Sequence, residues 1–322
     1  MKSRKYLPEL YSILKYCRSA GSAGEHAMIK KHIKPLGVQT DKVGNLYKYI
    51  GKKPKVLWSC HTDTVHKDKS GPMQTITLDH NDNPSKIFKT DNEVLGADCG
   101  TGVWIMIQMI KARVRGLYIF HRAEECGGIG SDYIVDKHKH LLKGIDKAVA
   151  FDRYGYESIV THQSMRRTCS DGFADSLAKL LESNKMYFTA DRGGSFTDTS
   201  NYAELISECT NLSVGYMSHH TSKEYQDVNH AVQLCDSMLK LGNQFEDLPA
   251  LRDPTVVDYS DRYTDSFNTA YHQYDNDLTQ TVYENPDVVA TILKEQLHHL
   301  SEDEIATLIE DRYYLDGENI PW

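Results

Sequence analysis

Short apolar runs and amphipathic segments alternate along most of the chain. The runs are typical of buried strands, and the segments repeat apolar residues every three to four positions, which is typical of helices. The predicted strands cover residues 55–60, 116–121, 147–152, 158–162, 186–191 and 211–216. The predicted helices cover residues 6–17, 25–33, 100–112, 129–140, 173–184 and 228–245. This order predicts an α/β fold, with a mixed, largely parallel sheet covered by helices on both faces.

Two segments in the first third of the chain depart from this alternation. Residues 38–51 predict two short strands around a turn at Gly44-Asn45. Residues 66–94 predict a hairpin-like region before the alternation resumes. The sequence shows no internal repeat.

The last part of the chain has a different character. Residues 250–283 are rich in Asp, Tyr, Thr and Asn and show little periodicity. Two helices are predicted beyond them, and Ser301 with Glu304 forms a capping-box pattern at the start of the second. We therefore predict a main domain at residues 1–245 and a small helical C-terminal extension at residues 246–322, packed on the main domain rather than acting as a separate binding module.

The composition is that of a soluble globular protein. Among 322 residues, 25% are charged and 40% are hydrophobic, and the formal net charge is -8. No concentrated basic block is present to neutralise phosphates, so we expect no nucleic-acid partner.

The cellular compartment follows from two features. Residues 1–20 lack the continuous apolar core of a signal peptide, and the longest apolar run, residues 103–110, is too short to span a bilayer. The seven cysteines have no paired spacing, which favours reduced thiols over a disulfide framework. We expect a cytoplasmic protein with no membrane partner.

The stretch VLWSCHTDTV, residues 56–65, ends an apolar run in His61 and Asp63. Both side chains are costly to bury unless they are paired or bound to a ligand. Residues two apart on an extended chain point the same way, so the two side chains should converge. They form either a hydrogen-bonded pair or a metal ligand with its supporting carboxylate.

Similar polar residues stand where other predicted strands end or helices start. They are Asp98, the pair Glu124-Glu125, Asp152, and the pair His219-His220. Each alone has an ordinary explanation, such as a helix cap, a solvated surface or a polar loop. Ligands gather at the carboxyl ends of strands in such sheets, however, and imidazoles with several carboxylates make the ligand set of a hydrolytic two-metal site. Adjacent glutamates can then supply one ligand and one general base.

The order HTD, GAD before a Gly-rich helix start, Glu-Glu, Asp and His resembles the co-catalytic zinc peptidases. That group includes bacterial leucine aminopeptidase, peptidase T and the glutamate carboxypeptidase relatives, and the resemblance covers about residues 5–245. It implies two divalent metal ions, zinc or alternatively cobalt or manganese. By this resemblance, His61, Asp98 and Asp152 hold one metal, and Asp98 bridges to the second.

The resemblance also assigns the remaining roles. Glu125 and a late histidine complete the second metal site, Glu124 is the general base, and Asp63 orients the first histidine from behind. The segment HTSKEY resembles the His-Thr/Ser-x-x-Glu pattern of these peptidases, which favours His220 over His219 as the late ligand.

The chain departs from its relatives in three ways. Cys99 stands where many relatives have a second acidic residue. The lid domain of the carboxypeptidase-like members is absent, and residues 66–94 are too short for the inserted domain of the self-compartmentalising aminopeptidases. The resemblance therefore implies a compact, lidless catalytic core.

The segment DRGGSFTDTSNY, residues 191–202, resembles the Gly-rich loop that borders the substrate site in these families. The resemblance implies that Asp198 and Thr199 position the substrate or the groups around the metals. The alternative is an ordinary strand-to-helix turn with Thr197 or Asp198 as N-cap.

Together these features predict a metal-dependent exopeptidase, preferably an aminopeptidase, that cleaves short peptides with an activated water. An N-acyl amino acid deacylase on the same site is the alternative. A non-catalytic binding protein of the same fold would be expected to lack a ligand, whereas every ligand type is present. The sequence does not determine the preferred side chain, the native metal or the oligomeric state.

Overall fold

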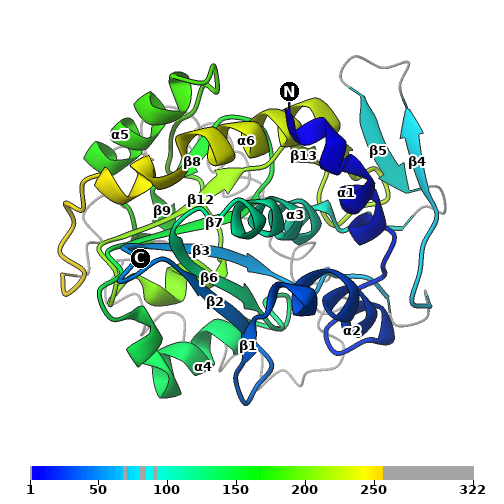
Figure 1. Cartoon of the computed structure of the whole chain (residues 1–322), viewed down its shortest axis with the longest axis horizontal. Coiled ribbons are helices and arrows are strands. Elements are labelled where there is room, and N and C mark those ends of the chain that lie inside the picture. Colours follow the sequence, from blue (N-terminus) through cyan, green and yellow to red (C-terminus); the bar gives the residue numbers. More distant parts are fainter. Residues whose placement is uncertain (1, 68–70, 80–84, 90–92, 165, 257–322) are drawn as a thin grey trace, which may run out of the picture. The chain divides into compact units, whose positions relative to one another are not determined.

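The computed structural model describes residues 2–67, 71–79, 85–89, 93–164 and 166–256 (Figure 1). The chain divides into two compact units, Met1–Tyr259 and Ser260–Trp322. The two helices predicted near the C-terminus lie outside the described residues. The domain boundary after residue 245 stays a prediction.

An eight-stranded sheet forms the centre of the first unit, in the order β1-β2-β6-β3-β7-β12-β8-β11. The neighbours β6, β3, β7 and β12 are parallel, whereas β2 and β8 are antiparallel to β6 and β12. This arrangement confirms the predicted mixed, largely parallel sheet. The strands are β1 Gln39–Thr40, β2 Leu46–Ile50, β3 Val56–His61, β6 Gly116–His121, β7 Lys147–Arg153, β8 Ser158–Val160, β11 Thr189–Asp191 and β12 Glu208–Ser213.

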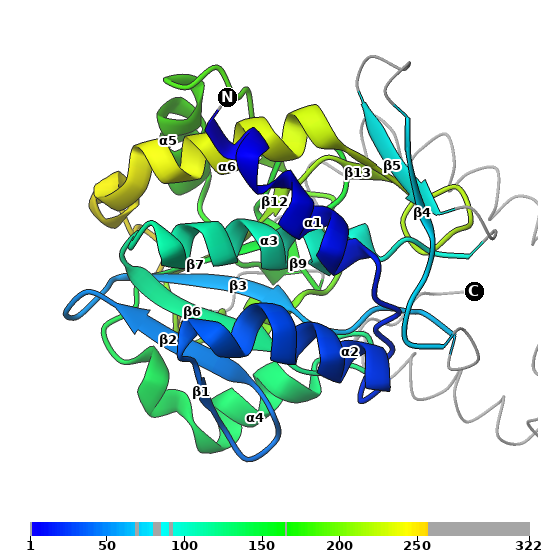
Figure 2. The ribbon, with the colours of Figure 1, turned by 45° about the vertical axis from the view of Figure 1, so that its right-hand side comes forward.

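Helices cover both faces of this sheet (Figure 2). One face packs against α1, α3 and α6, and the other against α4. The alternation along β6 explains this, because Tyr118 and Phe120 enter the first core and Leu117 and Ile119 the second. The helices are α1 Leu7–Leu14, α2 Ala23–Met28, α3 Ala97–Lys111, α4 Ile129–Lys137, α5 Asp171–Glu182 and α6 Val228–Leu241. No described helix has both the length and the apolar character needed to cross a membrane.

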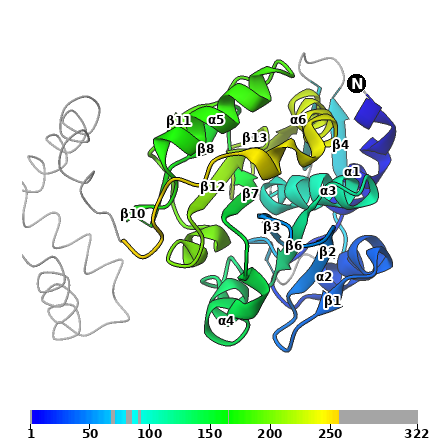
Figure 3. The ribbon, with the colours of Figure 1, turned by 60° about the vertical axis from the view of Figure 1, so that its left-hand side comes forward.

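Smaller elements surround the central sheet (Figure 3). A four-stranded sheet contains β13 Tyr216–Met217, β14 Tyr225–Asp227, β5 Lys86–Lys89 and β4 Ile76–Asp79, and its β4–β5 pair confirms the predicted hairpin. A two-stranded ribbon joins β9 His162–Gln163 to β10 Arg166–Arg167. Short 3-10 helices cover Lys2–Tyr6, Lys34–Leu36, Lys139–Leu142, Asp198–Tyr202 and Gly242–Asp247, and a π-helix covers Ile29–Ile33.

Several predicted elements differ in extent from those observed, and two strands show why. The strand expected at 211–216 ends at Ser213, because Gly215 adopts a left-handed φ of 88° and the chain then enters the smaller sheet as β13. The strand expected at 186–191 is reduced to β11, Thr189–Asp191. Its apolar residues Met186 and Phe188 are buried in the core ahead of the strand.

Helix α3 starts three residues earlier than the sequence predicts. The helix begins at Ala97, with Gly96 as its N-cap at a φ of 73°, so Asp98 lies in the first turn rather than before it. Gly102, one turn further on, lets the helix approach β7 closely. A Cβ atom there would lie 2.2 Å from the backbone oxygen of Phe151. This close approach brings the first turn of α3 near the end of β7.

Glu9 links α1 to α3 and to the π-helix after α2. Its carboxylate accepts hydrogen bonds from Gln108 at 2.8 Å and Lys111 at 2.7 Å, and it lies 3.5 Å from Nδ1 of His32. Burial alone would raise the pKa of Glu9, but the contacts with His32, Lys111 and Gln108 outweigh it and lower the pKa to about 2. The ionised form therefore stabilises the fold.

Replacing Glu9 with Gln should lower the free energy of unfolding at pH 7 by about 1–2 kcal/mol, after allowance for solvent screening. The folded pKa of about 2 lies below the ordinary value of 4.5. The stabilisation is therefore complete above pH 4.5 and is lost as the pH falls through 2. Urea unfolding of wild type and variant should show a difference that shrinks over this range. A difference independent of pH would contradict the role of the charge, and Glu182→Gln on the exposed end of α5 is the control.

Candidate metal centre

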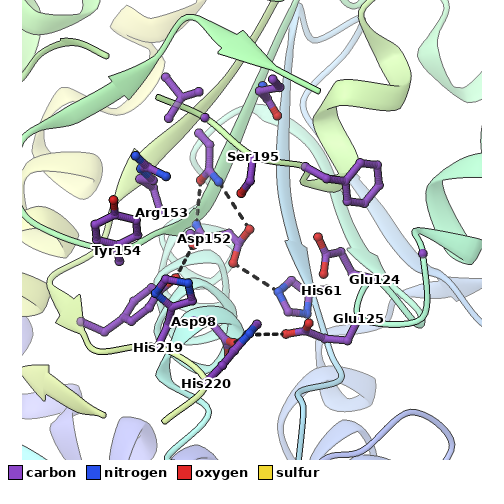
Figure 4. A pocket seen from close by; sticks show the side chains of 17 residues that line it. His61, Asp98, Glu124, Glu125, Asp152, Arg153, Tyr154, Ser195, His219 and His220 are labelled. Carbon is purple, nitrogen blue, oxygen red and sulfur yellow. Dashed lines mark hydrogen bonds and ion pairs between the residues drawn. The ribbon is translucent and has the colours of Figure 1, made fainter. Parts of the chain in front are cut away.

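The carboxyl ends of the central strands face one cavity with a volume of ≈ 430 Å³. Figure 4 shows its acidic and imidazole side chains pointing toward one another. The predicted site residues in its wall are His61, Asp98, Glu124, Glu125, Asp152, His219 and His220. They come from β3, the first turn of α3, the turn after β6, the end of β7 and the turn after β13. The fold thus assembles donors that lie far apart in the sequence.

The first group of donors forms where β3 and β7 end. Nε2 of His61 lies 3.3 Å from Oδ1 of Asp152. Donor atoms of His61 and Asp98 also lie within 4.8 Å of each other. The other ring nitrogen, Nδ1, lies 3.0 Å from the backbone oxygen of Asp63. That contact leaves Nε2 as the ring nitrogen that faces the carboxylates.

The second group of donors surrounds His220. Its Nε2 lies 3.1 Å from Oδ2 of Asp98 and 3.0 Å from Oε1 of Glu125. These two hydrogen bonds raise the pKa of His220 to about 10. The neighbouring His219 stacks instead on Tyr154, with ring centroids 5.2 Å apart. His220, and not His219, therefore lies among the carboxylates.

Asp98 belongs to both groups. Its donors lie within 4.8 Å of those of His61 in one group and of Glu125 and His220 in another. Its Oδ1 accepts a hydrogen bond from the backbone N–H of Cys99, which fixes the carboxylate in the first turn of α3. Asp98 is thus shared by the two groups of donors.

The chemistry of these donors fits two divalent cations. Imidazole nitrogens and carboxylate oxygens are ordinary ligands of zinc, and cobalt and manganese accept the same atoms. Each histidine contacts carboxylates: His61 contacts Asp152, and His220 contacts Asp98 and Glu125. The aspartate shared by the two groups would allow two cations to bind close together.

Asp63 is fully buried and holds two segments together. Its Oδ1 and Oδ2 accept hydrogen bonds from the backbone N–H groups of Glu124 and Glu125, at 3.1 and 3.2 Å. Its carboxylate lies 3.5 Å from Nδ1 of His61, farther away than its own backbone oxygen. The carboxylate therefore positions the glutamate pair more directly than it positions the histidine.

Glu124 lies in the cavity wall and is 9% exposed. Burial raises the pKa of its carboxyl to about 9; His61 acts in the opposite direction, and Asp152, Asp198 and Glu125 raise the pKa further. A divalent cation nearby would lower it. In its ionised form, a carboxylate in this position can accept a proton from water and later donate it to another group.

The model of one protein family, described as peptidase family M28, matches residues 45–296. The chain belongs to peptidase family M28. The match confirms the resemblance to the co-catalytic zinc peptidases, and peptidases of this family are metal-dependent. The protein is therefore a metallopeptidase. No curated protein matches the chain.

Solved structures share the fold of this M28 peptidase. The aminopeptidase PepT from Bacillus cereus ATCC 10987 is 13% identical, with 74% of this chain and 98% of that chain covered at a TM-score of 0.60. The TET1 peptidase from Pyrococcus horikoshii is 14% identical, with 74% and 99% covered at a TM-score of 0.57. A tripeptidase from Staphylococcus aureus subsp. aureus Mu50 is 13% identical, with 76% and 99% covered at a TM-score of 0.60.

Cys99 lies beside the candidate metal centre, where its thiol makes two hydrogen bonds. Its thiol donates to the backbone oxygen of Asp63 and accepts a hydrogen bond from the buried guanidinium of Arg18 at 3.2 Å. Burial raises the pKa of Cys99 to about 12. Cys99 lies within 4.8 Å of His61 and Asp98, but its Sγ is already engaged in the hydrogen bonds with Asp63 and Arg18.

Asp198 and Thr199 lie behind the cavity and not in its wall. They are 1% and 0% exposed and start the 3-10 helix Asp198–Tyr202. Of the two predicted roles, their burial fits positioning of the groups around the metals better than direct contact with substrate. Oδ2 of Asp198 lies 3.3 Å from Nδ1 of His121, and Thr199 hydrogen-bonds to Gln163. Thr197 is the N-cap residue but makes no side-chain capping bond.

Two supporting residues were not predicted. Glu224 is 1% exposed and accepts hydrogen bonds from the backbone N–H groups of residues 95–97, which holds the first turn of α3 and hence Asp98. Its place in the HTSKEY pattern was the available signal. Asn211 hydrogen-bonds to the backbone and carboxylate of Asp152 from β12. Nothing in the local sequence marks Asn211, since its role depends on the pairing of β12 with β7.

Proposed function

We propose that this M28 peptidase is an aminopeptidase that removes N-terminal residues from short peptides with two divalent cations, zinc in the first instance. The convergence of two imidazoles and three carboxylates beside an additional glutamate carries the proposal. The similarity in fold to PepT and the TET1 peptidase supports the choice of an aminopeptidase. All seven cysteines are free thiols, which supports a location in the reducing cytoplasm.

The proposed ligands fall into two sets that share Asp98. His61 and Asp152 would complete the first, and Glu125 and His220 the second. Bound there, the cations would polarise the scissile carbonyl and make a water more acidic. Asp63 keeps both glutamates in place through their backbone N–H groups.

Glu124 is the proposed general base. Its side chain is in the cavity wall and is not needed in either ligand set. It takes a proton from the attacking water and later returns that proton to the amine that leaves. Glu224 and Asn211 act indirectly: Glu224 holds the first turn of α3 and hence Asp98, and Asn211 holds Asp152.

The size of the cavity supports a short substrate. A volume of ≈ 430 Å³ lies toward the lower end of the range for small-molecule sites, which is about 300–1,000 Å³. It accommodates the end of a peptide near the reacting bond rather than a folded chain.

The test uses the full chain freed of metal with a chelator and then reloaded with zinc, cobalt or manganese. Cleavage of Ala-Gln-amide is compared with cleavage of its N-acetyl form. We expect about two ions per chain, activity that returns with the metal, and preference for the free amine. Preference for the acetylated peptide would favour the N-acyl amino acid deacylase. If metal restored no activity on either substrate, the enzymatic proposal would be wrong.

A further inference from the structure

The cavity has a second wall that the proposed metal chemistry does not use. Figure 4 shows Arg153 and Tyr154 on one side of the pocket and Glu124 and Glu125 on the other, with Asp152 between them. Among the described residues that line the cavity, Arg153 is the only one with a permanent positive charge. Its charge lies on the side of the pocket opposite Glu124 and Glu125.

An irregularity in the sheet places this arginine in the cavity. Consecutive residues on a strand normally point to opposite faces, yet Asp152 and Arg153 both line the pocket. The register between β7 and β12 shifts here, since Asn211 pairs with Ala150 but Ser213 pairs with Arg153. The strand β7 thus has one extra residue at this point, and such bulges redirect side chains next to active sites.

The guanidinium is held in a fixed orientation. Nη2 of Arg153 donates to Oδ2 of Asp191 at 3.0 Å, and its Cζ lies 4.2 Å from the centroid of the Tyr154 ring. Tyr154 stacks on His219 with an interplanar angle of 15°, and His219 packs edge-on against Tyr216. Nε of Arg153 is buried without a hydrogen-bond partner. An arginine held in this way loses little entropy when it binds a planar anion.

We propose that Arg153, supported by Tyr154 and Asp191, binds a carboxylate of the substrate and makes this enzyme selective for peptides that carry one within reach of the scissile bond. The inference rests on the proposed peptidase function. Two sources provide the same chemistry: an acidic side chain, or the C-terminal carboxylate of a very short peptide. The bidentate geometry of guanidinium and carboxylate explains why this wall would favour either over a neutral amide.

Four peptides separate these sources: one neutral reference and three that each carry one carboxylate at a different position. They are Ala-Gln-amide, Ala-Glu-amide, Ala-Gln with a free C-terminus, and Glu-Gln-amide. For the wild-type enzyme we expect kcat/KM for at least one acidic peptide to exceed that for Ala-Gln-amide by tenfold or more. That ratio should fall toward one in Arg153→Gln and be partly retained in Arg153→Lys. The peptide that carries the preference identifies the source.

Arg113→Gln, at an exposed position after α3, is the matched control and should keep the wild-type ratio. If Ala-Gln-amide is cleaved but no acidic peptide is preferred, the carboxylate site is wrong while the proposed function stands. A preference that persists in Arg153→Gln also overturns it. If no peptide is cleaved, the proposed function fails, and the carboxylate site is then tested by measuring peptide binding to the metal-loaded Glu124→Gln protein. A Kd for an acidic peptide tenfold lower than for Ala-Gln-amide, lost when Arg153 is also replaced, would support the site. Equal Kd values for the acidic and neutral peptides would overturn it.

Discussion

Replacing Glu124 with Gln is expected to lower kcat for peptide hydrolysis by about 10²–10⁴-fold. The amide keeps the size of the side chain but cannot accept the proton of the attacking water. Because Glu124 belongs to neither proposed ligand set, the metal content should remain that of the wild type. Steady-state kinetics, with metal analysis of the same samples, measures both effects.

The control for this variant is Glu182→Gln, which makes the same chemical change on the exposed end of α5. Its kcat should equal that of the wild type. If Glu124→Gln kept more than about a tenth of the wild-type kcat, the assigned general base would be wrong. If it lost metal as well as activity, Glu124 would be a ligand.

Replacing Asp98 with Asn is expected to remove both metal ions and to abolish activity. Asp98 has donors near those of His61 and near those of Glu125 and His220, so its charge should hold both cations. Loss of a supporting residue alone costs about 10–100-fold in metal affinity, and loss of a shared ligand should cost more. Metal analysis after dialysis against a weak chelator measures the loss.

Glu125→Gln provides the comparison, because it should weaken one site and leave the other. Asp175→Asn, on the exposed face of α5, should retain the wild-type metal content. Two ions in Asp98→Asn would contradict the bridging role. One ion lost from Asp98→Asn and one from Glu125→Gln would show that Asp98 serves a single cation.

Periodicity predicted the central elements well where they are long and amphipathic or continuously apolar. Helix α6, with an apolar residue at nearly every third or fourth position, begins at Val228 as predicted. Periodicity failed where a single backbone position decides the outcome. The left-handed Gly215 sends the chain into a second sheet, and the left-handed Gly96 starts α3 earlier than expected. Such turns depend on what the chain packs against afterwards.

The candidate site divides in the same way. The ligand types were visible because His61, Asp98, Asp152 and the paired residues stand at strand ends or helix starts. The role of Asp198 stays a prediction, since a Gly-rich loop looks the same in sequence whether its polar residue faces the cavity or lies 1% exposed behind it.

The sequence by itself determined which donor atoms the protein has, in which order they occur, and that strands and helices alternate. These are properties of single residues and of short spacings. Only the tertiary structure decided that the carboxylate of Asp63 holds the glutamate pair and that Arg153 reaches the cavity. Those outcomes depend on distances between residues far apart in the chain. They are set by strand order and by one extra residue in β7, which long-range packing determines and local sequence does not.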